Sequence, residues 1–240
     1  MFDRIFKKTR NFTIGTLNQV NREIWLENVL KLIPKGSRIL DAGAGELQYK
    51  KYCNHLDYVS QDFGSYDGVG NNKGLQMKRW DNSKLDIISD ITCIPAPKAS
   101  FDAIMCIEVF EHLPKPIAAI KEFSRLLRKN GTLILTAPFC SLTHFAPYHF
   151  YSGFNRYFYE KHLPEHGFII EEILPNGSYF EFLAQELRIR LPNTYSRQNL
   201  KLRDRLAIKQ VLILLQKMQD SDTGSSELLC FGYHIKAKKI

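Results

Sequence analysis

Several signatures that would fix the class of this 240-residue chain are missing from it. It has no Gly-Lys-Ser/Thr element, which excludes a phosphate-binding P-loop. Its five cysteines include no Cys-x-x-Cys pair, so we expect neither a disulfide framework nor a metal site. No apolar run approaches the ~20 residues of a bilayer-spanning helix, and the N-terminus lacks the apolar core of a secretion signal. These absences favour a cytoplasmic protein with at most peripheral membrane contact.

Composition and charge are those of a soluble globular chain, with 44% hydrophobic and 24% charged residues. We expect one domain over 1–240, made of a helical cap (1–35), a cofactor-binding core (36–175), a helical insertion or lid (176–226) and a last strand (227–240). The net charge is +8, and much of the excess lies within 188–209. That basic segment is either a solvated face or a contact for an anionic group of the substrate or partner.

The stretch from Arg38 to Glu46 organises the chain. An apolar strand runs into Asp41, and Gly43 and Gly45 follow at alternate positions, which predicts a strand, a tight turn and a helix up to about residue 53. A dinucleotide-binding turn would carry a third glycine, and the acidic Glu46 would repel a pyrophosphate. The turn therefore favours a nucleoside ligand without phosphates.

Strand patterns alternate with helix patterns along the chain, which predicts a doubly wound, mostly parallel sheet with helices on both of its faces. Pro114 and Pro116 open a helix that we expect to end at Asn130-Gly131. The other expected helices are 16–33, 179–191 and 202–218. The expected strands are 38–41, 57–62, 85–88, 101–107, 132–136, one starting at 167–170, and 228–237.

Acidic side chains follow successive strands, and the carboxyl ends of parallel strands share one edge of a sheet. Asp62 lies where a carboxylate can accept both hydroxyls of a ribose. Asp90 can accept an adenine amino group, with Ile91 against the ring. Each aspartate alone would be explained by helix capping or turn formation. Three of them in step with the glycine turn, Asp41 included, favour ligand binding.

The motifs together resemble those of class I S-adenosylmethionine-dependent methyltransferases. The matching pieces are Ile39–Gly45, Asp62, Ser89-Asp90-Ile91, Cys106–Leu113 and Leu127–Leu133. The resemblance implies a Rossmann-like sheet of seven strands, the last antiparallel, and S-adenosylmethionine as cofactor. It implies that Asp41 and the glycine backbone hold the methionine end of the cofactor. The cofactor-binding residues expected on this basis are Asp41, Ala42, Gly43, Gly45, Asp62, Phe63, Asp90, Ile91, Cys106 and Glu108.

Aromatic residues make up nine of the 23 positions from 138 to 160, a density that favours a pocket lining. His112 follows the fourth strand, where the transferred methyl group would lie, and is the first candidate to position or deprotonate the acceptor. His144 and His149 are the next candidates. A structural hydrogen bond is the alternative role for each histidine. The expected substrate-binding residues are Phe139, Tyr148, Tyr151 and Arg156.

A small-molecule acceptor is favoured, such as a sugar, a polysaccharide precursor or a related metabolite. An Asn/Asp-Pro-Pro-Tyr-like element for base amines is missing after the fourth strand, and so is a Pro-Cys nucleophile for pyrimidine carbons. A nucleic-acid acceptor is therefore disfavoured, although the basic charge keeps an RNA or protein methyltransferase as an alternative. A cofactor-binding partner subunit without turnover is a third possibility. The sequence leaves the oligomeric state open.

Overall fold

The computed structural model describes residues 13–190 and 201–240, with no side-chain description for 189 and 190. The basic N-terminal residues 1–12 and the polar stretch 192–200, including Arg197, lie outside the described residues. The chain divides into two compact units. One comprises the described residues up to 21 together with 177–231. The other comprises residues 22–176 and 232–240 and contains the whole sheet.

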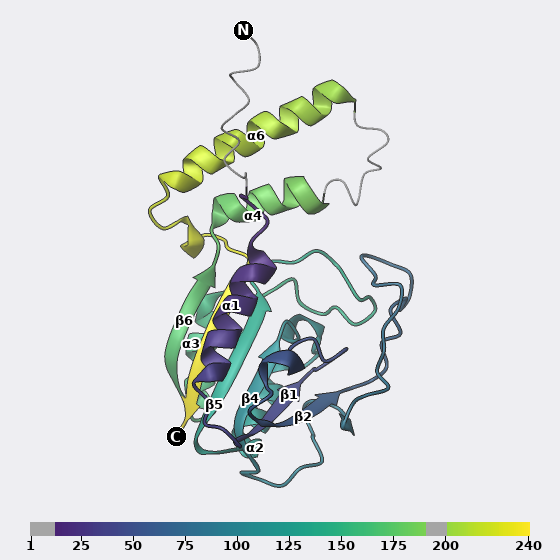
Figure 1. The fold of residues 1–240 in the computed structure, drawn as a ribbon, viewed down its shortest axis with the longest axis vertical. Coiled ribbons are helices and arrows are strands. Elements are labelled where there is room, and N and C mark those ends of the chain that lie inside the picture. Colours follow the sequence, from purple (N-terminus) through teal and green to yellow (C-terminus); the bar gives the residue numbers. More distant parts are fainter. Residues whose placement is uncertain (1–12, 191–200) are drawn as a thin grey trace. The chain divides into compact units, whose positions relative to one another are not determined.

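The sheet has seven strands in the order β3-β2-β1-β4-β5-β7-β6 (Figure 1). Strands β1 to β5 are parallel, whereas β7 runs antiparallel to both of its neighbours, β5 and β6. This confirms the expected fold class. The strands are β1 Arg38–Ala42, β2 Asp57–Asp62, β3 Ile87–Ile88, β4 Phe101–Ile107, β5 Leu127–Pro138, β6 Phe168–Asn176 and β7 Gly232–Lys239.

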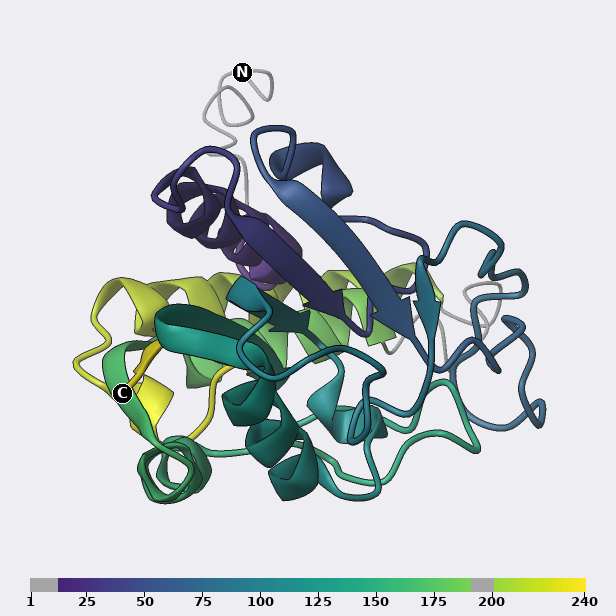
Figure 2. The ribbon, with the colours of Figure 1, turned by 90° about the horizontal axis from the view of Figure 1, so that it is seen from below.

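Helices cover both faces of the sheet (Figure 2). On one face, α1 (Asn18–Lys31) packs its residues Leu26 and Leu30 on Ile39 of β1 and Met105 of β4. The other face carries α2 (Pro116–Leu126) and α3 (Arg156–Glu165). Helices cover both faces, so the side chains of β1 and β4 are buried whichever face they point to. This explains the nearly continuous apolar sequences of these two strands.

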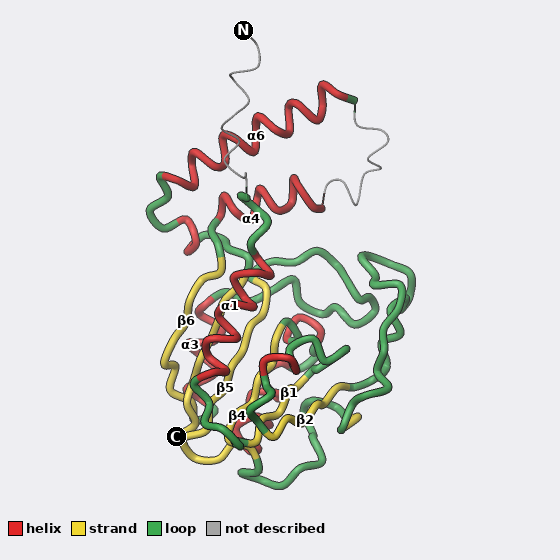
Figure 3. The backbone as a smooth tube through the Cα atoms, viewed as in Figure 1, coloured by secondary structure: helices red, strands yellow, loops and turns green. Residues whose placement is uncertain are grey.

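One expected helix is absent, and the end of another was wrongly predicted. The glycine turn leads into turns and a short 3₁₀ segment, Lys50–Tyr52, with Leu47 at a φ of 62° that interrupts any helix (Figure 3). Helix α2 ends at Leu126 rather than at Asn130-Gly131, because Leu127 already pairs with Phe101 as the first residue of β5. Asn130 keeps a left-handed φ of 66°, but within the strand.

The second unit is helical. It contains α4 (Tyr179–Gln185), continued by a π-helical turn, Glu186–Arg190, then α6 (Leu202–Asp220) and a 3₁₀ turn, Ser225–Glu227. A small apolar cluster holds it together: Ile14, Ala184, Leu212 and Leu215. Helix α4 covers 179–185 of the expected 179–191 helix, the π-helical turn follows, and residue 191 lies outside the described residues, whereas α6 matches the expected 202–218 helix. Among the described residues, no helix is both long and apolar enough to cross a bilayer.

Candidate cofactor and acceptor site

The glycine turn begins directly after β1 and is tied to β2. The amides of Gly43 and Ala44 both donate to the carbonyl of Gln61, at 2.8 and 2.9 Å. Gly43 and Gly45 have φ values of 83° and 48°. A Cβ at Gly43 would lie 2.5 Å from Val109 Cγ2, and one at Gly45 would lie 2.5 Å from Cζ2 of the Trp80 ring. Both positions therefore require glycine for backbone conformation and for close approach.

Two buried carboxylates flank this turn. Asp41 accepts the Tyr58 hydroxyl at 2.6 Å. Asp62 accepts the amide of Gly45 at 3.1 Å with one oxygen and that of Gly64 at 3.0 Å with the other. Burial raises the pKa of Asp41 to about 7; the Tyr58 hydrogen bond opposes this, and the nearby Asp62 adds to it. Burial also raises the pKa of Asp62, against its backbone hydrogen bonds.

The remaining cofactor candidates lie at the ends of β2, β3 and β4 or directly after them. Phe63 stacks edge-on against Tyr148, with ring centroids 4.9 Å apart. Asp90 caps the Thr92 amide at 2.8 Å, and Ile91 beside it is buried. Cys106 is fully buried within β4. Glu108 follows β4 at a φ of 55°, accepts the Thr136 hydroxyl at 2.8 Å and pairs with Arg22 at 3.1 Å.

An aromatic wall that the sequence did not reveal stands over this edge. Tyr66 stacks on Phe145 at 4.6 Å, and Trp80 meets both rings edge-on, at 5.5 Å from Tyr66 and 5.4 Å from Phe145. Tyr66 and Trp80 belong to the long loop between β2 and β3, while Phe145 belongs to the aromatic segment after β5. No sequence pattern marked Trp80, because the loop that carries it has no periodicity.

Backbone hydrogen bonds join this loop to the aromatic segment. Leu75 donates to Thr143 at 3.0 Å and accepts from Phe145 at 2.9 Å, forming an isolated parallel bridge between Leu75 and His144. Asn71 donates to Ala146 at 2.9 Å. The long loop and the segment after β5, which the sequence separates by some seventy residues, thus form one continuous structure.

The three candidate histidines come together beside the buried Glu111. The ring centroids of His112 and His144 are 4.6 Å apart, and those of His144 and His149 are 4.8 Å apart. His112 also stacks on Phe145 at 5.2 Å. Glu111 and His112 lie in the 3₁₀ turn Phe110–His112 that follows β4, and His149 is 3.1 Å from the Ser141 hydroxyl. The sequence pattern singles out the histidines, whereas nothing in it points to Glu111.

Burial dominates the charge states in this cluster. It lowers the pKa of His112 to about 3, with the neighbouring His144 as the next cause. It also lowers the pKa of His149, again followed by His144. Burial, followed by repulsion from Glu108, raises the pKa of Glu111 well above its usual range. At neutral pH the His112 ring is therefore uncharged.

Of the four expected substrate-binding residues, Tyr148 lies nearest the cluster, since its carbonyl accepts from His112 Nδ1 at 2.6 Å. The ring of Tyr151 packs at 5.3 Å from Phe154. Phe139 packs 5.9 Å from Tyr233 of β7. Arg156 begins α3 and pairs with Glu160 one turn on, at 2.8 Å. Tyr148 therefore lies beside the histidine cluster, and Phe139 and Arg156 pack toward β7 and within α3.

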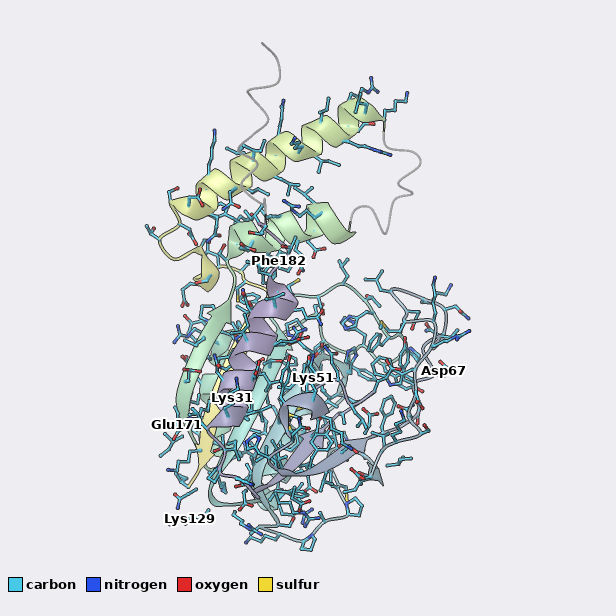
Figure 4. All side chains as sticks on the ribbon, in the orientation of Figure 1. Lys31, Lys51, Asp67, Lys129, Glu171 and Phe182 are labelled. Carbon is cyan, nitrogen blue, oxygen red and sulfur yellow. The ribbon has the colours of Figure 1, made fainter. Side chains whose placement is uncertain are left out.

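A cavity of about 500 Å³ adjoins the glycine turn and the β2–β3 loop, with Glu46, Asp67, Lys78, Arg79, Trp80 and Asp81 as its lining. Asp67, labelled in Figure 4, braces the loop there by accepting the amides of Val69 and Gly70 at 2.9 and 2.8 Å. Glu46 accepts the amide of Asp81 at 3.1 Å. The cavity lining is thus polar and carries both signs of charge.

The seven-stranded sheet with its antiparallel β7 is the fold of class I methyltransferases, and the cofactor that the motifs of this chain imply is S-adenosylmethionine. Residues 40–135 match the model of a family described as a methyltransferase domain. A solved S-adenosylmethionine-dependent methyltransferase from Archaeoglobus fulgidus has the same fold, with a TM-score of 0.55, 16% identity, and coverage of 92% of this chain and 94% of that one.

Two further comparisons agree. Phosphoethanolamine N-methyltransferase 2 of Haemonchus contortus, solved with S-adenosylmethionine, matches with a TM-score of 0.53 and 14% identity over 91% of this chain and 52% of that one. The ubiquinone biosynthesis O-methyltransferase of Xanthomonas oryzae pv. oryzae (strain PXO99A) is 49% identical over 104 residues, which are 42% of this chain and 43% of that protein. The chain thus spans less than half the length of such curated relatives.

The residues present fit this cofactor. Each oxygen of Asp62 accepts one backbone amide, and a carboxylate oxygen has a second lone pair to offer to a hydroxyl. Asp41 is buried beside the turn, in which Gly43 is partly exposed and Gly45 is buried. The Trp80 ring covers Gly45 in this structure, so a ligand above that glycine would need the ring to shift.

Proposed function

We propose that this chain methylates a hydroxyl group of a small molecule, with S-adenosylmethionine as methyl donor. The aromatic wall and the histidine cluster at the carboxyl end of β4 support this proposal, because they form a poorly hydrated lining beside the expected cofactor position. The curated relatives are named as O-methyltransferases of ubiquinone biosynthesis. A sugar, a polysaccharide precursor or a related metabolite, which can carry an anionic group, is the acceptor class that we favour.

Within this proposal, Asp41 and the backbone of Gly43 to Gly45 hold the methionine end of the cofactor, Asp62 the ribose and Asp90 the adenine. Bound there, S-adenosylmethionine supplies an electrophilic methyl group on a sulfonium that leaves as a neutral thioether. The aromatic rings of the wall suit a cation whose charge vanishes during transfer. Alignment of the acceptor oxygen with the methyl group is the main contribution of the protein.

The orientation of His112 is the observation that carries the assignment of the acceptor site. A carbonyl can only accept, so the 2.6 Å contact requires Nδ1 of His112 to donate to Tyr148. The neutral ring then presents the lone pair of Nε2, which can accept a hydrogen bond from an acceptor hydroxyl. Phe145 fixes the plane of the ring by stacking on it. His112 thus positions the hydroxyl in this proposal.

Cofactor binding is tested by calorimetry on Asp62→Ala, which removes the carboxylate assigned to the ribose. We expect a loss of affinity of about 10-fold or more, since a charged hydrogen bond contributes ~1.5–3 kcal/mol. The matched control is Asp57→Ala, at the exposed opposite end of the same strand. Equal affinities for both variants and the wild type would refute the assignment of Asp62.

The acceptor is sought by incubating the chain with isotope-labelled S-adenosylmethionine and fractionated cell extract, followed by mass spectrometry. We expect label in a small-molecule fraction. Label confined to RNA or protein would favour the alternative substrate classes, and steep salt dependence of RNA binding would support the former. Cofactor binding without label in any fraction would indicate a partner subunit without turnover.

A further inference from the structure

We propose that Glu111, His112 and His144 bind a divalent transition-metal ion, with Zn²⁺ as the best match. One ligand atom from each of these residues lies within 4.8 Å of the other two. Sequence spacing gives no sign of such a site, because 32 residues separate His112 from His144. The fold brings the three together at the carboxyl end of β4, next to the proposed acceptor position.

The tautomers of both histidines are set by backbone carbonyls. Nδ1 of His112 contacts the carbonyl of Tyr148 at 2.6 Å, and Nδ1 of His144 contacts that of Leu142 at 2.8 Å. Since carbonyls only accept, each Nδ1 carries a proton, and Nε2 is the ring nitrogen that would bind the ion. This second-sphere arrangement, an Nδ1–H held by a backbone carbonyl, is the one that usually orients metal-binding histidines.

The two Nε2 atoms face the same carboxylate oxygen. Oε1 of Glu111 is 3.7 Å from Nε2 of His112 and 3.9 Å from Nε2 of His144. These separations are too long for hydrogen bonds. Two ligand atoms each 2.1 Å from a tetrahedral ion are about 3.4 Å apart, so a small inward movement of the side chains would complete the coordination. Two imidazoles and one carboxylate are a ligand set of catalytic zinc sites.

The other carboxylate oxygen of Glu111 provides an independent observation. Glu111 is only 1% exposed, and its Oε2 has no hydrogen-bond partner within the part of the chain that the structure describes. A buried carboxylate without a donor on one oxygen is costly, whereas a cation in the cluster compensates for it. His149, whose ring centroid lies 4.8 Å from that of His144, is the nearest further imidazole.

The position of the ion indicates what it would do. Three protein ligands leave a fourth position open, and a hydroxyl oxygen bound there loses its proton to solvent more readily. This role rests on the proposed function and changes one contact in it: with the ion bound, the Nε2 lone pair of His112 binds the metal, and the ion holds the acceptor hydroxyl in its place. The binding experiments below contain neither cofactor nor acceptor, so failure of the metal site and failure of methyl transfer can be told apart.

The test uses the full chain, stripped with a chelator and titrated with Zn²⁺ in a competition assay, with bound metal measured by elemental mass spectrometry. Mg²⁺, which prefers oxygen ligands, is the comparison ion. We expect one Zn²⁺ per chain, a rise in melting temperature with Zn²⁺, and little effect of Mg²⁺. With Co²⁺ in place of Zn²⁺, visible absorption of a four-coordinate site is expected.

Two variants and one control make the assignment specific. Glu111→Gln and His144→Ala should each weaken Zn²⁺ binding by more than about 100-fold, since even outer-sphere changes typically cost 10–100-fold. His144 is partly exposed, so its variant is a second test if the buried Glu111→Gln fails to fold. The control is His162→Ala, which removes a histidine paired with Glu165 at 3.1 Å but lacking a third ligand. The proposal would be overturned if the wild type bound no stoichiometric Zn²⁺, or if wild type and His144→Ala bound Zn²⁺ equally well.

Discussion

The buried carboxyl of Asp41 should make the stability of the protein depend on pH. Its side chain is 1% exposed, and burial, opposed by the Tyr58 hydroxyl and reinforced by Asp62, raises its pKa from 3.8 to about 7. Raising the pKa from 3.8 to about 7 means that folding disfavours the charged carboxylate by about 4 kcal/mol, at 1.36 kcal/mol for each unit of pKa. The variant Asp41→Asn cannot ionise and retains an oxygen that can accept the Tyr58 hydroxyl.

The sign of the effect follows from proton binding. Between about pH 4 and pH 7 the folded state keeps the Asp41 proton while the unfolded state loses it, so the contribution of Asp41 to stability is present at low pH and is lost as the pH rises through 7. We therefore expect the free energy of unfolding of Asp41→Asn, relative to wild type, to increase by about 3 kcal/mol between pH 4.5 and pH 8.5, because only the part of the titration above pH 4.5 falls in this range.

Urea denaturation followed by circular dichroism, at several pH values over this range, measures the difference directly. Comparing the two proteins at each pH cancels the titration of all other groups. Asp57→Asn, at the exposed start of β2, controls for the loss of one charge. If the difference between wild type and Asp41→Asn is the same at pH 4.5 and pH 8.5, the argument that burial holds the Asp41 proton is refuted.

Two further predictions concern packing and ion pairing. Gly45→Ala should destabilise the protein by about 1–3 kcal/mol more than Gly36→Ala. Both positions have a positive φ, but only a Cβ at Gly45 would lie 2.5 Å from the Trp80 ring. Thermal melting of the two variants measures the difference. Glu122→Gln should cost about 1–3 kcal/mol, since it removes a buried carboxylate that pairs with Arg125 at 2.6 Å. Glu27→Gln, at an exposed pair with Lys31, should cost under about 0.5 kcal/mol, and comparable losses for the two variants would contradict this reasoning.

The sheet was largely predictable because its signals are local. The apolar run of β4 and the aspartates that end β1 and β2 are read directly from neighbouring residues, and parallel strands bring their ends to one edge. The helix expected after Gly45 was wrong because Leu47 takes a left-handed conformation, which residue types alone do not reveal. The end of α2 was wrong because pairing of Leu127 with β4 overrides the capping preference of Asn130-Gly131.

The site was only partly predictable, for a different reason. His112 could be named because it directly follows a recognisable strand. Its relation to His144 depends on how the segment after β5 folds back, and the contact of Trp80 with Gly45 depends on a loop without sequence periodicity. Such contacts between distant segments leave no pattern in a single sequence.

The bridge between Leu75 and His144 links the loop that carries Trp80 to the segment that carries the histidine cluster. Trp80 lies five residues beyond Leu75 on the same loop, so a ligand that displaces the indole from Gly45 also pulls on the strand-like contact at His144. We expect donor and acceptor to bind with reciprocal coupling: whatever factor the first ligand adds to the affinity of the second, the second adds to that of the first.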